Sequence, residues 1–193
     1  MPAHLVGHSF GGALAIHIAQ NHPQLVASLC LYEPTAFNLL KASQKSDIKL
    51  AIEIEALSQS IASGIDQGNY TFAAHVFTEF WGGLGAWDAL DSRKQEATIG
   101  WVAKAPVDFA ALLGEAPDAS LPGDIAITLI CGQHTHPHTR RISQILTESN
   151  PHIRNIVLPG ANHLGPCIFR EKVADLVFDH IAHADFTPQP SHA

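Results

Sequence analysis

The chain is poor in positive charge. Its 193 residues include 11 Lys and Arg against 18 Asp and Glu, which gives a formal net charge of −7 with neutral histidines. No basic run is longer than two residues, as in Arg140–Arg141. Proteins hold nucleic acids largely by neutralising phosphates with Lys and Arg. The composition therefore argues against nucleic acid as a partner.

Long apolar runs are also missing. A membrane-spanning helix needs about 20 consecutive apolar residues, and no stretch of this sequence reaches that length. A secretory signal begins with a basic segment followed by an apolar run, and the N-terminus has neither. We therefore expect a protein that does not associate with a membrane and that resides in the cytoplasm.

Cysteine is rare, with three residues in the chain. An odd count in a chain of this kind does not suggest a disulfide framework. Cys30 and Cys131 lie within apolar runs, which predicts buried, reduced thiols. We expect Cys167 to be buried at the start of the last helix. The chain is 46% hydrophobic and 15% charged, a balance typical of a globular domain.

What the sequence does contain is an alternation of apolar strands and amphipathic helices at both ends of the chain. Alternation of this kind predicts an α/β protein, with a mostly parallel sheet flanked by helices. The closing helix is predicted at Glu171–His183, with another at Arg140–Ser149. The predicted strands are Ala3–Val6, Leu25–Leu31, Ile125–Cys131 and Ile153–Leu158.

The segment between the second and third predicted strands looks wholly helical. A crossover between parallel strands needs only one helix, so the additional helices predict a separate layer that serves as a lid. One apolar stripe runs through 50–61 and is ended by Gly64, and another runs through 72–81 and is stopped by Gly82-Gly83. We therefore predict a core formed by 1–34 and 118–183, a helical cap at 35–117, and a flexible tail at 184–193.

One motif carries chemistry. Gly7-His8-Ser9-Phe10-Gly11 fits G-x-S-x-G between a predicted strand and a predicted helix. Such a turn strains the serine and exposes its hydroxyl at the helix N-terminus, where negative charge is favoured. The glycines at 7 and 11 are expected to let the strand and helix approach each other. Phe10 N–H then points to where an oxyanion would form, and His8 is expected to shape the pocket. The alternative is a glycine-rich packing turn.

Two segments resemble parts of the α/β-hydrolase superfamily, in its lipase/esterase and C–C-bond hydrolase branches. His4–Gly12 resembles the nucleophile elbow, and Leu158–Pro166 resembles the loop that carries the catalytic histidine. The resemblance implies that Ser9 is the nucleophile and that His163 is its general base, whereas a surface-loop histidine is the alternative for His163. Relatives with Asp at the elbow are dehalogenases or epoxide hydrolases. Serine implies transfer of an acyl group from a small apolar ester, thioester, lactone or activated C–C substrate to water, without a cofactor.

The third member of the triad departs from the family pattern. Most members carry an acid after the strand predicted at Ile125–Cys131, but that loop has Thr135 at the expected place. Some members place the acid after the preceding strand, where this chain has Glu33, and we propose Glu33 as the orienting carboxylate. A surface or hinge glutamate, or a dyad without an acid, remains open.

The same loop carries histidines at alternating positions. Alternate histidines in an extended segment can face one metal ion, but carboxylate and cysteine ligands are missing nearby. A polar rim of the active site is the preferred interpretation, so we predict no metal. The three histidines are His134, His136 and His138.

The second departure concerns the region before the elbow. Family members normally have four strands there, whereas Met1 lies only one strand before Ser9. The resemblance thus implies the C-terminal portion of the fold, from a gene model begun at an internal Met or from a gene fragment. The absent part normally supplies the second oxyanion N–H. Ala3–Val6 would then be an exposed edge strand through which copies of the chain could associate. A catalytically impaired remnant that binds a ligand or a protein is the alternative function.

Overall fold

The structure is a computed structural model that describes residues 1–41, 45–114 and 118–186. The chain forms two compact units, each of which is described by itself. The first unit comprises Met1–Leu39 and Pro117–Ala193, and the second comprises Leu40–Ala116. The corresponding boundaries predicted from the sequence lie after residues 34 and 117.

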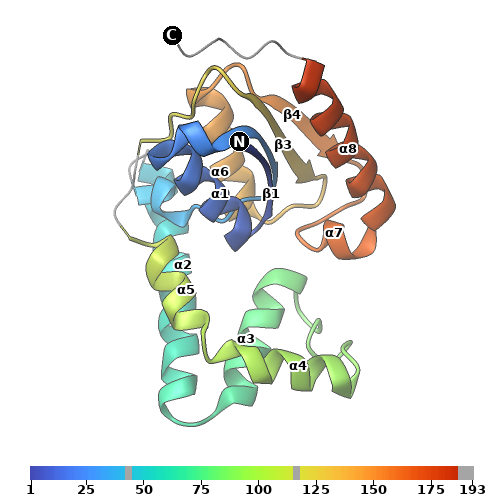
Figure 1. Cartoon of the computed structure of the whole chain (residues 1–193). Helices are drawn as coiled ribbons and strands as arrows, with labels where there is room; N and C mark the ends of the chain where they lie inside the picture. The colour runs from blue at the N-terminus through green and yellow to red at the C-terminus, as the bar shows by residue number, and fades with distance from the viewer. Residues whose placement is uncertain (42–44, 115–117, 187–193) are drawn as a thin grey trace. The chain divides into compact units, whose positions relative to one another are not determined.

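The first unit contains a four-stranded sheet in which all described strands are parallel (Figure 1). The strands lie side by side in chain order, and the two central ones consist almost wholly of buried residues. Strands covered on both faces are expected to be continuously apolar. The α/β class with a parallel sheet, predicted from the sequence, is confirmed. The strands are β1 (Ala3–His8), β2 (Val26–Tyr32), β3 (Ala126–Gly132) and β4 (Arg154–Leu158).

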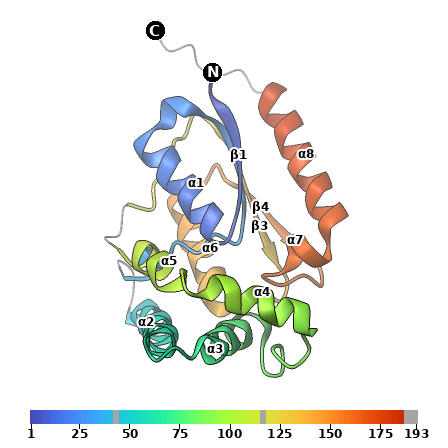
Figure 2. The same ribbon diagram turned by 60° about the horizontal axis from the view of Figure 1, so that its bottom comes forward.

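Helices cover both faces of this sheet (Figure 2). On one face lie α1 (Phe10–Asn21) and α6 (Pro137–Ser149), and on the other lies α8 (Arg170–Phe186), which follows the short helix α7 (Gly165–Ile168). Short 3-10 turns, η1 (Pro23–Leu25) and η2 (Phe37–Lys41), flank β2. Successive strand residues point to opposite faces, and the side chains beneath α8 form one apolar cluster. Its buried members are Cys30, Tyr32, Ile130, Leu158, Ala161 and Val173.

A chain of hydrogen bonds crosses the α8 face of the sheet. His180 Nδ1 lies 2.8 Å from Thr128 Oγ1, and its Nε2 lies 2.8 Å from Ser28 Oγ. Ser28 Oγ is also 2.8 Å from His4 Nδ1, and His4 Nε2 is 3.2 Å from an Asp185 carboxylate oxygen. The Asp185 carboxylate only accepts hydrogen bonds. With both histidines neutral, each group can therefore donate to the next one along the chain, from Thr128 to Asp185. Burial lowers the pKa of His180 to about 4.

Two expectations about the end of the chain are wrong. Helix α8 continues to Phe186 rather than ending at His183, because Ala184 is buried and Asp185 pairs with His4. Residues 184–186 therefore belong to the helix, and the remainder of the predicted tail lies outside the described residues. Cys167 is exposed, because the short helix α7 docks through Gly165, which packs against the Tyr32 ring.

The buried His180 predicts that the fold weakens in acid. The pKa of His180 is about 4 in the folded chain and about 6.5 in an unfolded one. The unfolded state thus binds the extra proton first, and stability is lost as pH falls from 6.5 to 4. In urea unfolding, His180→Gln should reduce this loss by on the order of 3 kcal/mol. His17→Gln, an exposed histidine on α1, is the control. If the free energy of unfolding changes equally with pH in the unmodified chain and in both variants, the prediction is contradicted.

The second unit is helical. Its helices are α2 (Lys45–Asp66), α3 (Tyr70–Gly82), α4 (Ser92–Val102) and α5 (Ala105–Leu112). Gly64, expected to end a helix, instead lies inside α2, where a Cβ would come 2.8 Å from the Phe72 ring. This glycine therefore lets α3 pack closely on α2. Among the described helices of the chain, none combines the length and the hydrophobicity that crossing a membrane requires.

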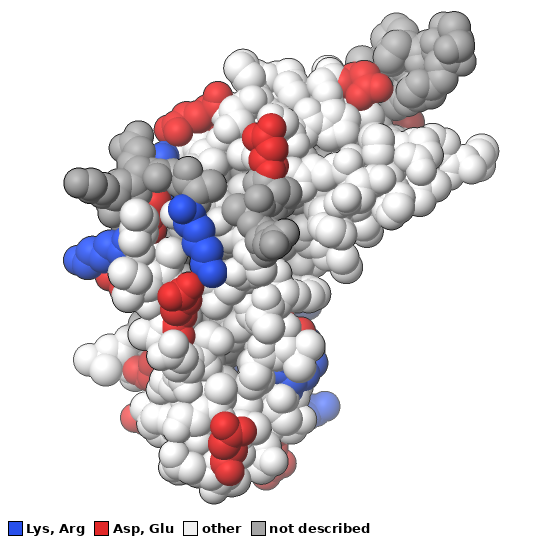
Figure 3. Space-filling model, turned by 90° about the vertical axis from the view of Figure 1, so that its left-hand side faces the viewer, with Lys and Arg blue, Asp and Glu red and all other residues white. Residues whose placement is uncertain are grey.

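Strand β1 forms one edge of the described sheet. It pairs with β2 alone among the described strands, and residues 1–32 contain no Lys, Arg, Asp or Glu. Figure 3 shows a broad uncharged area on the side of the first unit where α1 lies. Val6 is 55% exposed on β1, and Leu14 is 49% exposed on α1. Natural edge strands usually carry charges that block pairing with another chain, whereas β1 carries none. The self-association expected from the sequence therefore stays a prediction for this edge.

A charge on this edge should oppose such self-association. Val6→Lys places an ammonium beside the unpaired backbone of β1, whereas Val157→Lys does the same on β4, where Val157 is 59% exposed. We expect the mass of the unmodified chain in light scattering to rise with concentration above the monomer value of 20.7 kDa. Val6→Lys should remain a monomer, and Val157→Lys should behave as the unmodified chain. A constant monomer mass for all three would contradict the prediction.

Candidate active site

Ser9 lies in the turn between β1 and α1 in a strained conformation. Its φ is +55°, a region that L-residues other than glycine rarely adopt. Four backbone hydrogen bonds hold the turn. Ser9 N–H donates to the Tyr32 carbonyl at 3.1 Å, and the Ser9 carbonyl accepts from Gly12 at 3.0 Å, Ala13 at 3.1 Å and Thr35 at 3.2 Å. Neighbouring backbone therefore fixes the serine, and its hydroxyl lies at the amino end of α1.

Close packing around the turn requires glycine at two positions. A Cβ on Gly7 would come 2.5 Å from the Gly11 carbonyl oxygen, and a Cβ on Gly12 would come 2.9 Å from Pro34 Cβ. Gly11 itself would meet nothing within 4 Å. The expectation that Gly11 makes room for the strand is therefore wrong, since it is the backbone of Gly11 and not the absence of its side chain that faces Gly7.

His163 reaches Ser9 from the loop that follows β4. Its Nε2 lies 3.0 Å from Ser9 Oγ, and the residue is 4% exposed. The loop rests on the end of β3: His134 N–H donates to the Ala161 carbonyl at 2.8 Å, and a Cβ on Gly132 would come 2.4 Å from that carbonyl oxygen. The structure thus brings together two residues that the resemblance paired.

Glu33 is the residue that the structure places behind His163. It directly follows β2 with a φ of +42°, and it is fully buried. One carboxylate oxygen accepts from Gly132 N–H at 2.8 Å, and the other lies 2.9 Å from His163 Nδ1. Burial by itself raises the pKa of Glu33, but hydrogen bonds from His163, Gly132 and Thr135 outweigh burial and hold that pKa below its ordinary value. Glu33 is therefore ionised at neutral pH.

These contacts determine where the protons lie. An ionised carboxylate only accepts, so His163 Nδ1 carries the proton that faces Glu33. In the neutral ring Nε2 then has a lone pair, and it accepts the hydroxyl proton of Ser9. Ser9, His163 and Glu33 therefore form one directed chain of hydrogen bonds at the carboxyl ends of β1, β4 and β2, the edge of a parallel sheet where ligands bind in open α/β folds.

Thr135 occupies the place where the resemblance led us to expect an acid. Thr135 Oγ1 lies 2.8 Å from Thr139 Oγ1, and Thr139 Oγ1 lies 3.5 Å from the Glu33 carboxylate. Thr135 in the loop after β3 and Thr139 in α6 thus supply hydrogen-bond donors to a carboxylate that comes from β2. In the sequence, the one sign of these hydrogen bonds to Glu33 is that Thr135 stands where an acid is expected.

The histidines of the same loop do not form a ligand set. The rings of His136 and His138 stack with centroids 4.7 Å apart, and their Nδ1 atoms are 2.8 Å apart. Among the described residues, no group of three or more His, Cys, Asp or Glu side chains is arranged to hold a metal ion.

The two remaining predicted site residues flank Ser9 on either side. Phe10 begins α1, so its N–H lies in the first helical turn, where backbone N–H groups point out of the helix end. The ring of His8 lies beside the ring of His163, with centroids 4.9 Å apart, and His8 Nε2 lies 2.8 Å from the His163 carbonyl oxygen. His8 therefore contacts the loop that carries His163.

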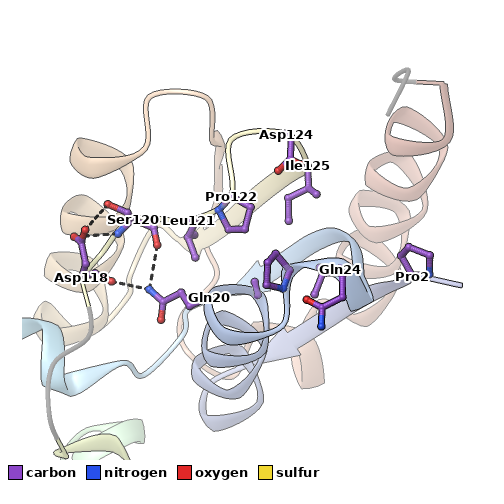
Figure 4. Close-up of a pocket in the computed structure, with 12 residues that line it drawn as sticks. Pro2, Gln20, Gln24, Asp118, Ser120, Leu121, Pro122, Asp124 and Ile125 are labelled. Carbon is purple, nitrogen blue, oxygen red and sulfur yellow. Dashed lines mark hydrogen bonds between the residues drawn. The ribbon is translucent and has the colours of Figure 1, made fainter. Parts of the chain in front are cut away.

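A separate cavity of about 600 Å³ opens at the other end of the sheet (Figure 4). Pro2, Val26 and Ile125 line it, at or beside the amino ends of β1, β2 and β3. None of Ser9, Glu33 or His163 lines this cavity. The candidate site is therefore the triad at the carboxyl ends of the strands, not this opening.

Comparison with known proteins assigns the chain to a family. Residues 2–177 match the model of the alpha/beta hydrolase family, and the chain belongs to that family. No curated protein matches the sequence. The family assignment agrees with the strand-turn-serine-helix arrangement and with the histidine after the last strand.

Solved structures share the fold at low sequence identity. A hydrolase from Pseudomonas aeruginosa PA01 is 18% identical with a TM-score of 0.71. The match covers 93% of this chain and 64% of the hydrolase. A thermophilic esterase from Thermogutta terrifontis is 19% identical with a TM-score of 0.65, covering 95% of this chain and 65% of its own. Est816, an N-acyl homoserine lactone degrading enzyme, is 14% identical with a TM-score of 0.62, covering 92% of this chain and 67% of its own. The chain thus spans about two thirds of the length of these structures.

The elbow geometry predicts opposite outcomes for two glycine-to-alanine changes. Gly7→Ala forces a Cβ to within 2.5 Å of backbone, and overpacking of this kind costs about 1–3 kcal/mol. Gly11→Ala enters open space and adds helix propensity of about 1 kcal/mol. In urea unfolding, Gly7→Ala should therefore be destabilised and Gly11→Ala unchanged or more stable. Similar losses in the two variants would contradict the packing described for the turn.

Proposed function

We propose that the chain is a serine hydrolase that cleaves an ester-like bond of a small apolar substrate through an acyl-enzyme on Ser9. The observation that supports this most directly is the directed hydrogen-bond chain from Ser9 Oγ through His163 to Glu33, at 3.0 Å and 2.9 Å. A packing turn would need neither the strained serine nor a buried histidine-carboxylate pair behind it.

The proposed reaction follows from the proton positions. Ser9 Oγ attacks the substrate carbonyl carbon while its proton passes to His163 Nε2, and the resulting imidazolium is stabilised by the Glu33 carboxylate. The N–H of Phe10, in the first turn of α1, donates to the oxyanion. The tetrahedral intermediate then expels its leaving group, which takes the proton from Nε2. Water repeats the sequence on the acyl-enzyme, releases the acid and restores Ser9.

The electrostatic environment suits this chemistry. A base that must become an imidazolium benefits from a fixed negative charge close to it, and the pKa of Glu33 lies below its ordinary value. Glu33 therefore remains a carboxylate across the neutral range, so its protonation does not limit activity there. Esters, thioesters and lactones share the carbonyl that this arrangement attacks, and the structural neighbours include an esterase and a lactone-degrading enzyme.

A fluorophosphonate probe tests the proposal. Its phosphorus is attacked by an activated serine, a bond forms between Oγ and phosphorus, and fluoride leaves. We expect covalent labelling within the tryptic peptide 1–41, since Lys41 is the first Lys or Arg of the chain. Ser9→Ala should abolish labelling. Glu33→Gln keeps the shape of the side chain and removes its charge, and it should slow labelling by about 10⁴-fold.

The alternative function, a binding module without catalysis, is favoured by one observation, the uncovered edge of β1. The same probe separates the two functions. A chain that is folded by circular dichroism but unlabelled would favour the binding module. Equal labelling of the unmodified and Glu33→Gln proteins would instead contradict the role proposed for Glu33 and favour a dyad without an acid.

A further inference from the structure

Two consecutive carbonyls of the histidine loop are held by side chains from adjacent strands. Tyr32 Oη donates to the Asn162 carbonyl at 2.8 Å, and His8 Nε2 lies 2.8 Å from the His163 carbonyl. His8 and Tyr32 are register partners, the last residues of β1 and β2. Because partners in register point to the same face of a sheet, the two rings stand side by side, with centroids 5.6 Å apart in an edge-to-face arrangement.

The loop is shaped to fit these two rings. A Cβ on Gly165 would come 1.9 Å from Tyr32 Oη, so the chain needs glycine where it passes over the tyrosine. The Asn162 carbonyl also accepts from Gly165 N–H at 2.9 Å, which closes a turn that contains His163 and Leu164. Tyr32 is 4% exposed, so the loop carbonyl that it holds is sheltered from water.

The contact made by His8 has a particular consequence for the active site. A carbonyl oxygen only accepts, so His8 Nε2 must carry a proton, and the neutral ring suffices for this bond. His8 is the residue immediately before Ser9. The end of β1 therefore holds the nucleophile, Ser9, through its backbone. The side chain of the preceding residue, His8, holds the main chain of His163. The separation between Ser9 Oγ and His163 Nε2 is thus tied to one rigid strand end.

We infer that His8, assisted by Tyr32, is a positioning residue that fixes the general base against the nucleophile of the proposed hydrolase. The inference rests on the proposed function of Ser9 and His163. His8 holds the main chain of His163 through a hydrogen bond, and its ring packs beside the His163 ring with centroids 4.9 Å apart. Its removal should therefore displace the base rather than weaken substrate binding, and misplacement by about 1 Å can reduce a rate by about 100-fold.

A matched pair of substitutions isolates the hydrogen bond. His8→Gln and His8→Met have nearly the same length and shape, but only the glutamine Nε2 can donate to the His163 carbonyl. Tyr32→Phe removes one hydroxyl and nothing else. The control is the same Gln and Met pair at Leu14, a residue of α1 that is 49% exposed.

The first readout is the rate of fluorophosphonate labelling at Ser9. We expect His8→Met to slow labelling by 10- to 100-fold, His8→Gln to restore most of that loss, and Tyr32→Phe to slow labelling by about tenfold. In steady-state kinetics with an ester substrate, the substitutions should lower kcat and leave KM unchanged. The Leu14 pair should not differ. Equal losses in the glutamine and methionine variants at His8, or no loss in either, would overturn the inference.

The second readout does not depend on activity. Hydrogen exchange of the amides at 163–165 should be at least tenfold faster in His8→Met than in the unmodified chain, and close to normal in His8→Gln. If the unmodified chain is never labelled but the exchange rates differ in this way, the proposed function fails while the hold of His8 on the loop stands. If labelling occurs and exchange is the same in both variants, the inference is wrong and the proposed function stands.

Discussion

The buried hydrogen bond between Glu33 and His163 is the interaction that the geometry of the site depends on. A carboxylate fully removed from water is costly unless it is paired and hydrogen-bonded, and here the ring nitrogen, a backbone N–H and the neighbouring threonines do this together. The same bond selects the proton position on the imidazole, which leaves the opposite nitrogen to face Ser9. The same bond therefore both compensates the burial of the Glu33 carboxylate and orients the imidazole towards the hydroxyl of Ser9.

Parallel topology explains why residues so far apart in sequence meet. The strands end at one edge, so the residue that follows each strand falls within a few ångströms of those that follow its neighbours. Ser9 follows β1, Glu33 follows β2 and the loop of His163 follows β4. Between them, β3 ends in Gly132, whose N–H holds Glu33 and whose missing side chain admits the histidine loop. Even the strand that contributes no member of the triad therefore shapes it.

Much of this could be read from the sequence, for identifiable reasons. Apolar runs of strand length separated by amphipathic helices predicted the parallel sheet. The resemblance of the Ser9 turn and of the His163 loop to a known family implied that these two residues would meet. Glu33 could be reached only through the resemblance, in which some members place the acid after the preceding strand, because its partners lie on β3 and on the last loop and no local pattern marks a buried carboxylate. The roles of Gly12 and Tyr32, and the helical state of Gly64, could not be predicted because each depends on a neighbour from a distant segment. The extent of α8 was missed for a similar reason, since the bond to His4 that holds its last turn joins opposite ends of the chain.

Glu33 enters the site from β2, and Thr135 in the loop after β3 meets it with a hydroxyl group. An acid introduced at position 135 would place a second carboxylate beside Glu33, and two carboxylates that share a site raise the pKa of one of them. The hydroxyl at this position therefore keeps a single negative charge behind the imidazole.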